Sequence, residues 1–218
     1  SQTFQGGIIG MDLGDVDGDG KTEIVTIQGR KLTIYRKEYQ GLKPVGIFEP
    51  TAVDRFIYVS VVDMNRDGRS YIYLTNLRRK NAVRSAADKA RDAIGTGEDV
   101  SSYVLTVSGG KVQVVAEKIP YFLNAIHLGQ RGKVLVGQAQ GEKDTNAFRG
   151  DVYEMQLRGK SLVPTVAVNA PDGCNIFNFV KADINNDKID ETLMIDDSHN
   201  LRILSGAGDQ IWKGRYLF

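Results

Sequence analysis

The stretch Asp15-Val16-Asp17-Gly18-Asp19-Gly20-Lys21-Thr22-Glu23 places four acidic side chains within nine residues, around two glycines. Carboxylates this close repel one another unless a cation lies between them. Carboxylate and backbone carbonyl oxygens in a short, glycine-containing turn are the ligands that Ca²⁺ prefers. The stretch therefore predicts a calcium-binding loop. The alternative is a polar hairpin in which aspartate and glycine serve turn geometry alone.

An EF-hand is the obvious comparison for this loop, but the residue at position 26 does not fit an EF-hand. The EF-hand loop needs a bidentate glutamate at its twelfth position, which is Thr26 here. The flanking segments, residues 8–11 and 24–27, are apolar and β-branched and have no helical period. We therefore expect the loop to join two β-strands rather than two helices.

The same loop recurs twice further along the chain. Residues 63–71 keep oxygen-bearing side chains at positions one, three and five, but carry Tyr71 where the last carboxylate belongs. Residues 183–191 keep all four oxygen-bearing positions and replace the sixth-position glycine with Lys188. Each copy lies between two strand-like segments. The chain is therefore predicted to repeat one unit of strand, acidic loop and strand.

The pattern Asp-x-Asp/Asn-x-Asp-Gly-x-x-Asp/Glu between two strands resembles the FG-GAP or VCBS repeat of integrin-α-type β-propellers. In that family the loop joins the two innermost strands of a blade and holds Ca²⁺, so the resemblance implies structural calcium as a cofactor. It also implies that the seventh residue of each loop offers its backbone carbonyl; these residues are Lys21, Arg69 and Ile189. The side chains at the family's ligand positions are Asp15, Asp17, Asp19 and Glu23, then Asp63, Asn65 and Asp67, then Asp183, Asn185, Asp187 and Glu191.

Four strand-rich modules follow one another along the chain, at about residues 7–50, 56–119, 120–168 and 175–215. Four short strands per module is typical of a propeller blade. The predicted fold is therefore all-β: a β-propeller of four-stranded antiparallel blades, as a single domain or a propeller fragment. Four blades are the lower limit for a closed ring, so the sequence leaves open whether these modules belong to a larger propeller. The third module has no carboxylate in its loop, and we expect no metal there.

Residues 78–102 fall outside the module pattern. Within them a helical stripe of apolar side chains is formed by Val83, Ala86, Ala87, Ala90 and Ile94. Two interpretations stay open: a projecting helix that contacts a partner, or a mobile surface excursion. In a propeller this insertion emerges on the face opposite the acidic loops. Partners of the resembled family often dock on that face, and we expect a protein or a surface glycan to bind there.

Composition narrows the classes of function. The 218 residues carry a net charge of +1, and no basic stripe interleaved with aromatics suggests nucleic-acid binding. Cys174 is the single cysteine, so no internal disulfide is possible. No apolar run is long enough to span a membrane, and no signal peptide opens the sequence. Calcium sites of the extracellular class favour a periplasmic, cell-surface or secreted location.

Signatures of catalysis are missing from the sequence, which has no G-x-S-x-G, P-loop or H-E-x-x-H motif. His127, His199 and Cys174 lack the spacing of metal ligands or nucleophiles, and we interpret them as ordinary packing or surface residues. The favoured function is a non-enzymatic, calcium-stabilised propeller that serves as an interaction or scaffold module. The alternative is a polysaccharide hydrolase or lyase, which would need carboxylates, His or Tyr with shifted pKa values at the central channel.

Overall fold

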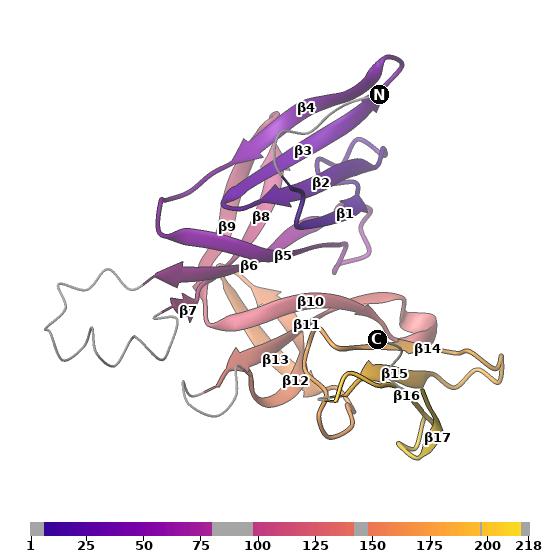
Figure 1. Ribbon diagram of the computed structural model, residues 1–218. Coiled ribbons are helices and arrows are strands. Elements are labelled where there is room, and N and C mark those ends of the chain that lie inside the picture. The colour runs from indigo at the N-terminus through magenta and orange to yellow at the C-terminus, as the bar shows by residue number, and fades with distance from the viewer. Residues whose placement is uncertain (1–6, 80–97, 142–147, 197, 215–218) are drawn as a thin grey trace, which may run out of the picture.

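The computed structural model describes residues 7–79, 98–141, 148–196 and 198–214. These residues form four antiparallel sheets, which we number I to IV, and the predicted all-β fold is confirmed (Figure 1). Sheet I contains β1 (Gly10–Gly14), β2 (Glu23–Gln28), β3 (Lys31–Glu38) and β4 (Gly41–Phe48). Sheet II contains β5 (Asp54–Val62), β6 (Tyr71–Arg79), β8 (Ser102–Ser108) and β9 (Lys111–Ile119), with the short β7 (Glu98–Val100) paired to β6.

The second half of the chain repeats this arrangement. Sheet III contains β10 (Tyr121–His127), β11 (Lys133–Gln140), β12 (Phe148–Arg158) and β13 (Ser161–Ala167). Sheet IV contains β14 (Phe179–Ala182), β15 (Glu191–Ile195), β16 (Leu201–Leu204) and β17 (Gln210–Lys213). Within each sheet the strands pair in chain order, apart from the side branch β7, so each sheet is an antiparallel meander.

The four sheets follow one another in an arc that does not close into a ring (Figure 1). Their innermost strands are β1, β5, β10 and β14, and each of these contacts the next in that order. This is the arrangement of propeller blades around an axis. The blade-like modules expected from the sequence are therefore present.

The segment predicted as an insertion is shorter than expected at both ends. β6 runs on to Arg79, and β7 pairs with it from Glu98 onward, so the ends of the 78–102 stretch belong to sheet II. The helical stripe predicted at residues 83–94 lies outside the described residues. In Figure 1 the end of β6 and the start of β7 lie at the left, whereas the acidic loops emerge at the right.

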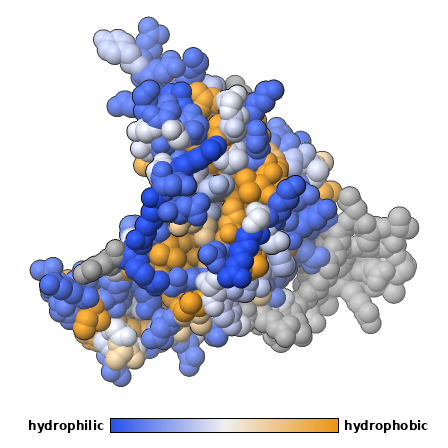
Figure 2. Space-filling view, turned by 180° about the vertical axis from the view of Figure 1, so that it is seen from behind, coloured by the Kyte–Doolittle hydropathy of each residue, from blue (hydrophilic) through white to orange (hydrophobic). Residues whose placement is uncertain are grey.

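Three apolar clusters form the core, and each lies mainly between two consecutive sheets. Alternation along the strands explains the first cluster, because every second residue of a strand faces the same side. Its fully buried members include Val25, Ile27, Leu32, Ile34, Phe56, Ile72 and Leu74. Seen from behind, hydrophobic side chains gather in the hollow at the middle of the molecule, between hydrophilic margins (Figure 2).

Sheet IV has one apolar face that the described residues leave uncovered. Ile195 and Leu201 pair across β15 and β16 and are 51% and 44% exposed. The ladders place them at the same positions as Ile27 and Leu32 of sheet I, which sheet II buries completely. Sheet IV thus carries the apolar pattern of a covered blade face on a surface that is open.

A buried carboxylate fixes the entry into sheet II. The side chain of Asp54 is fully buried and accepts hydrogen bonds from the Asn76 amide at 2.7 Å, the Arg78 Nε at 2.9 Å and the Thr51 hydroxyl at 2.5 Å. Burial by itself would raise the pKa of Asp54, but the hydrogen bonds from Arg78, Thr51 and Asn76 outweigh it and hold the pKa below its usual value. The charged form of Asp54 therefore ties β5 to β6.

Replacement of Asp54 with Asn is expected to lower the free energy of unfolding by about 2–3 kcal/mol at neutral pH, because Arg78 loses its partner. A lowered folded pKa stabilises the fold above the unfolded value of 3.8, and this contribution is lost as the pH falls through the folded pKa. Urea unfolding near pH 7 and again below about pH 3 should show that the variant and the unsubstituted chain differ less in free energy of unfolding at the lower pH. The exposed Asp172→Asn change is the control, and an unchanged difference at low pH would contradict the role of the charge.

Candidate metal centre

The three acidic loops share one pattern of backbone hydrogen bonds. In loop 1 (residues 15–23), the first aspartate accepts the N–H groups of the fifth and sixth residues at 3.2 and 2.8 Å. The same bonds measure 3.2 and 2.8 Å in loop 2 (residues 63–71), and 3.1 and 2.8 Å in loop 3 (residues 183–191). The aspartate at the fifth position accepts the N–H of the residue at the seventh position, at 2.9, 3.0 and 2.8 Å in loops 1, 2 and 3. The residues at the seventh position are Lys21, Arg69 and Ile189. The first and fifth aspartates thus build the turn.

The fourth and sixth residues of each loop have positive φ angles, and this explains the glycines. Gly20 and Gly68 at the sixth position have φ values of 81° and 88°, and Lys188 in loop 3 has a φ of 71°. A side chain in this left-handed region costs about 1 kcal/mol relative to glycine. Loop 3 therefore keeps the loop geometry despite the lysine, at some cost in stability.

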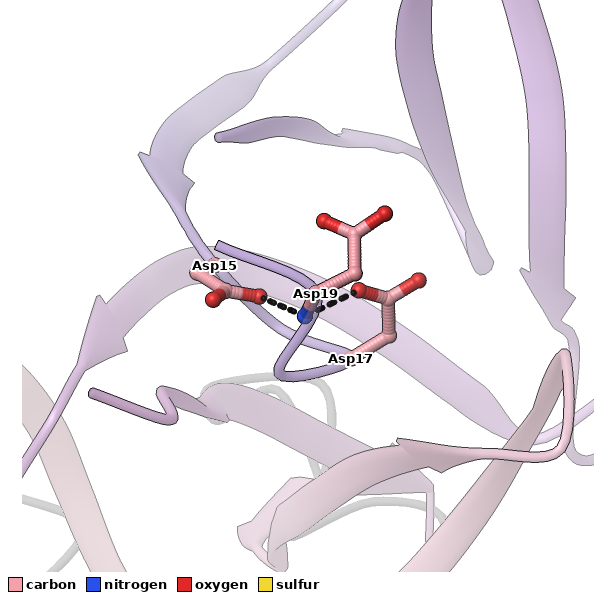
Figure 3. Close-up of side chains that lie close together, drawn as sticks. All are labelled: Asp15, Asp17 and Asp19. Atoms are coloured by element: carbon pink, nitrogen blue, oxygen red, sulfur yellow. Dashed lines mark hydrogen bonds between the residues drawn. The ribbon is translucent and has the colours of Figure 1, made fainter. Parts of the chain in front are cut away.

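Loop 1 brings three carboxylates together at its tip. Oxygens of Asp15, Asp17 and Asp19 all lie within 4.8 Å of one another, and among the described residues this is the one group of three acidic side chains so close. Figure 3 shows them grouped around the backbone nitrogen of Asp19, which donates to both Asp15 and Asp17 at 3.2 Å. Oxygens bound to one calcium ion at 2.3–2.6 Å are at most about 5 Å apart. These donors therefore fit a calcium ion.

The ninth residue of loops 1 and 3 is a buried glutamate that points inward. Glu23 accepts the N–H of Val16 at 3.2 Å, and Glu191 accepts the N–H of Ile184 at 3.1 Å. Their exposed fractions are 0% and 2%. Tyr71 at the ninth position of loop 2 has no carboxylate to offer. Both glutamates thus support the base of their loops, and loop 2 lacks this support.

Sequence reasoning missed the residue that offsets part of the negative charge of loop 1, which is Arg36 on β3. Its guanidinium lies 2.5 Å from Asp17, 3.3 Å from Asp19 and 3.2 Å from Glu23. Burial raises the pKa of Glu23, while the Val16 N–H and Arg36 oppose the rise. The Glu23 contact in turn raises the pKa of Arg36. A full positive charge therefore lies against three of the four carboxylates.

Comparison with known families bears on this geometry. Residues 15–74, which run from the first acidic loop through the second and into β6, match the family model described as "FG-GAP-like repeat". This segment is similar to an FG-GAP-like repeat. Together with the four blade-like sheets, the match supports a β-propeller-type module, and the predicted resemblance is confirmed at this level.

One curated relative matches the chain over part of its length. It is a protein of Aquifex aeolicus (strain VF5) described as "Uncharacterized protein", and it is 35% identical over 100 residues. The match covers 43% of this chain and 19% of the relative. The chain therefore spans about a fifth of the length of this relative. Among the described residues of the chain, no helix is long and apolar enough to cross a membrane.

The three acidic loops differ in how completely their predicted ligands are assembled. In loop 3 the Asn185 amide donates to Asp187 at 3.0 Å and to Glu191 at 3.2 Å, so these three predicted side chains lie together. In loop 2, Asp63 and Asp67 are fixed by backbone N–H groups, and Tyr71 leaves the set one oxygen short. The metal roles of all three loops, including Asn65 and the seventh-residue carbonyls, stay predictions. Sheet III has the 3₁₀ helix η1 (Gly129–Arg131) in place of an acidic loop.

Outside loop 1, the described part of the chain holds no second group of three His, Cys, Asp or Glu side chains close enough to share a metal ion. Burial raises the pKa of the Cys174 thiol to about 11, so it is a poor nucleophile near neutral pH. Burial also raises the pKa of Tyr103 to about 12. Glu23, the described carboxyl group whose pKa is raised, is enclosed and bound to Arg36.

Replacement of Lys188 with Gly is expected to raise the free energy of unfolding by about 0.5 kcal/mol, because the left-handed backbone no longer carries a side chain. The reverse change, Gly20→Ala, should lower it by about 1 kcal/mol; a Cβ there would meet no atom within 4 Å, so only the backbone is affected. Urea unfolding in EDTA measures both changes without metal. A destabilised Lys188→Gly variant would show that the lysine side chain stabilises loop 3.

Proposed function

We propose that this chain is a calcium-stabilised β-propeller-type module that acts as an interaction or scaffold unit outside the cytoplasm. The main support for this proposal is loop 1, in which oxygens of three carboxylates lie within 4.8 Å of one another. Hydrogen bonds from backbone N–H groups of the loop to Asp15 fix this turn. When bound, calcium supplies a positive charge that holds these oxygens together. Asp15, Asp17 and Asp19 would hold it, with the carbonyl of Lys21 as a further ligand.

The role of the ion in this proposal is structural. All the candidate ligands are protein oxygens on one short loop, and such a set pins a turn rather than activating a substrate. Loop 1 also contacts loop 2 directly, because the Ser70 N–H donates to the Asp15 carbonyl at 2.7 Å. An ion in loop 1 would therefore stiffen the junction between sheets I and II. Sites of this type in extracellular modules have calcium dissociation constants of about 0.1–1 mM, which supports an extracytoplasmic location.

The face opposite the acidic loops is the proposed binding surface for a protein or glycan partner. An open depression of about 710 Å³ lies there, and charged side chains of both signs line it, including Arg78, Arg79, Asp99 and Lys118. Arg79 is well exposed and forms a long ion pair of 3.9 Å with Glu98. Such a pair contributes little to stability, so the charge of Arg79 is available to a polar partner.

Thermal unfolding in EDTA, in Ca²⁺ and in Mg²⁺ tests the calcium proposal. Calcium at a hundredfold excess over its dissociation constant stabilises the folded state by about 2.7 kcal/mol, which is a rise of roughly 5–10 °C in the midpoint for a chain of this size. Magnesium should give much less, because it resists dehydration and needs octahedral geometry. The Asp183→Ala variant should lose the part of the rise that comes from loop 3.

Equal midpoints in EDTA and calcium, together with no bound calcium in equilibrium dialysis, would refute this proposal. The loops would then be polar turns. A rise of equal size in magnesium would contradict the calcium-type site and leave a nonspecific divalent effect.

A further inference from the structure

We infer that Arg36 is a built-in counter-cation of loop 1: it holds the loop together without a metal and competes with calcium for the same oxygens. The part of this inference that concerns calcium rests on the proposed function. The part that concerns the metal-free loop does not, and the two can be tested separately.

Strand alternation places Arg36 on the apolar face of β3, where a charged side chain needs a partner of opposite charge. On β3, Leu32, Ile34 and Arg36 face the same side, and the first two are fully buried against sheet II. The β2–β3 ladder, which pairs Ile24 with Tyr35, brings Arg36 opposite Glu23. Glu23 is completely buried, and an unpaired carboxylate in that position would be strongly disfavoured. The pair is therefore built into the hairpin.

The guanidinium extends beyond Glu23 to the tip of the loop. Its Nε atom contacts Glu23, while its Nη2 atom lies 2.5 Å from Asp17 Oδ2 and 3.3 Å from Asp19 Oδ2. The other oxygens of these two aspartates accept loop N–H groups, from Asp19 and Lys21. The oxygens that face Arg36 are thus the ones left over for a cation. A planar guanidinium with several donors suits this arrangement better than a lysine would.

Loop 3 shows the same turn without an arginine. The ladder that pairs Thr192 with Leu204 puts Ser205 at the position of Arg36. Loop 3 carries Asn185 where loop 1 carries Asp17, so its four ligand positions hold three negative charges against four in loop 1. At these ligand positions Arg36 offsets the extra charge: four negative charges and its one positive charge leave −3 in loop 1, which equals the charge of the three carboxylates at the ligand positions of loop 3. The arginine and the additional aspartate of loop 1 thus compensate each other.

The same contacts make Arg36 a competitor of calcium. A divalent cation at the tip needs oxygens of Asp17 and Asp19, so the guanidinium has to move off them while it stays on Glu23. The Arg36 side chain is 28% exposed, so it is not fully enclosed by its neighbours. Loop 1 therefore binds calcium more weakly than its four carboxylates alone would.

The variants Arg36→Gln and Arg36→Lys test this inference, with Arg30→Gln as the matched control. Arg30 lies in the turn between β2 and β3 and pairs with Glu49 at 3.2 Å, but both side chains are about half exposed. In EDTA, Arg36→Gln should lower the unfolding midpoint by about 5 °C, and amides 18–20 should exchange faster with deuterium. Arg30→Gln should change neither. Arg36→Lys should fall between the two, because it keeps the charge and loses the planar fork.

Calcium titration by calorimetry tests the competition. Arg36→Gln should bind calcium about tenfold more tightly at one site, because the net charge of loop 1 becomes more negative, while Arg30→Gln should match the unsubstituted chain. Unchanged or weaker binding by Arg36→Gln, beside normal binding by the unsubstituted chain, would overturn the competition. An unsubstituted chain and an Arg36→Gln variant that both fail to bind calcium would refute the proposed function as well as the competition. An unchanged midpoint and unchanged exchange in EDTA would overturn the role of Arg36 in the metal-free loop.

Discussion

The free inner edge of each blade is the constraint on which the arrangement of the sheets depends. An innermost strand has a neighbour on one side only, so backbone groups on its other edge need partners when they are buried. Polar side chains of the preceding sheet supply them. Asp12 accepts the N–H of Val61 at 2.6 Å, and the Thr75 hydroxyl bonds to both the N–H and the carbonyl of Leu123 at 2.8 Å. Ile176, just before β14, is bound in the same way by Gln138 and Asn124. These bonds set the order and spacing of the blades.

This constraint also brings loops 1 and 2 and the η1 turn of sheet III to one face and into contact. Once β1 is held against β5, the Asp15 carbonyl accepts the Ser70 N–H, and the Arg66 side chain of loop 2 reaches the Arg131 carbonyl of sheet III at 2.9 Å. Lys133 of sheet III in turn lies 2.5 Å from Asp12 of sheet I. The loops are thus parts of one connected rim, and a change in the charge of loop 1 acts on more than its own turn.

Much of this structure could be predicted from the sequence, because it depends on local patterns. The apolar, β-branched residues 24–27 predicted a strand where β2 lies, and the aspartate spacing predicted all three loops. Contacts between segments that are far apart in the chain could not be predicted from the sequence. Asp12 looks like a polar interruption of a strand until Val61 and Lys133 lie beside it. Arg36 could have been found, since a hairpin that turns at residues 29–30 pairs positions 23 and 36, and a charged residue on an apolar strand face needs a partner.

The open apolar face of sheet IV has a consequence for how the molecule comes apart. In a row of modules that contact only their neighbours, stability is a sum of contributions from each module and each junction. The described structure covers sheet IV on one face only, and few of its side chains are fully enclosed, among them Met194 and Leu204. Sheet II, by contrast, contributes to clusters on both its faces. Within the described structure, sheet IV is therefore held less tightly than sheet II, and we expect it to open more readily.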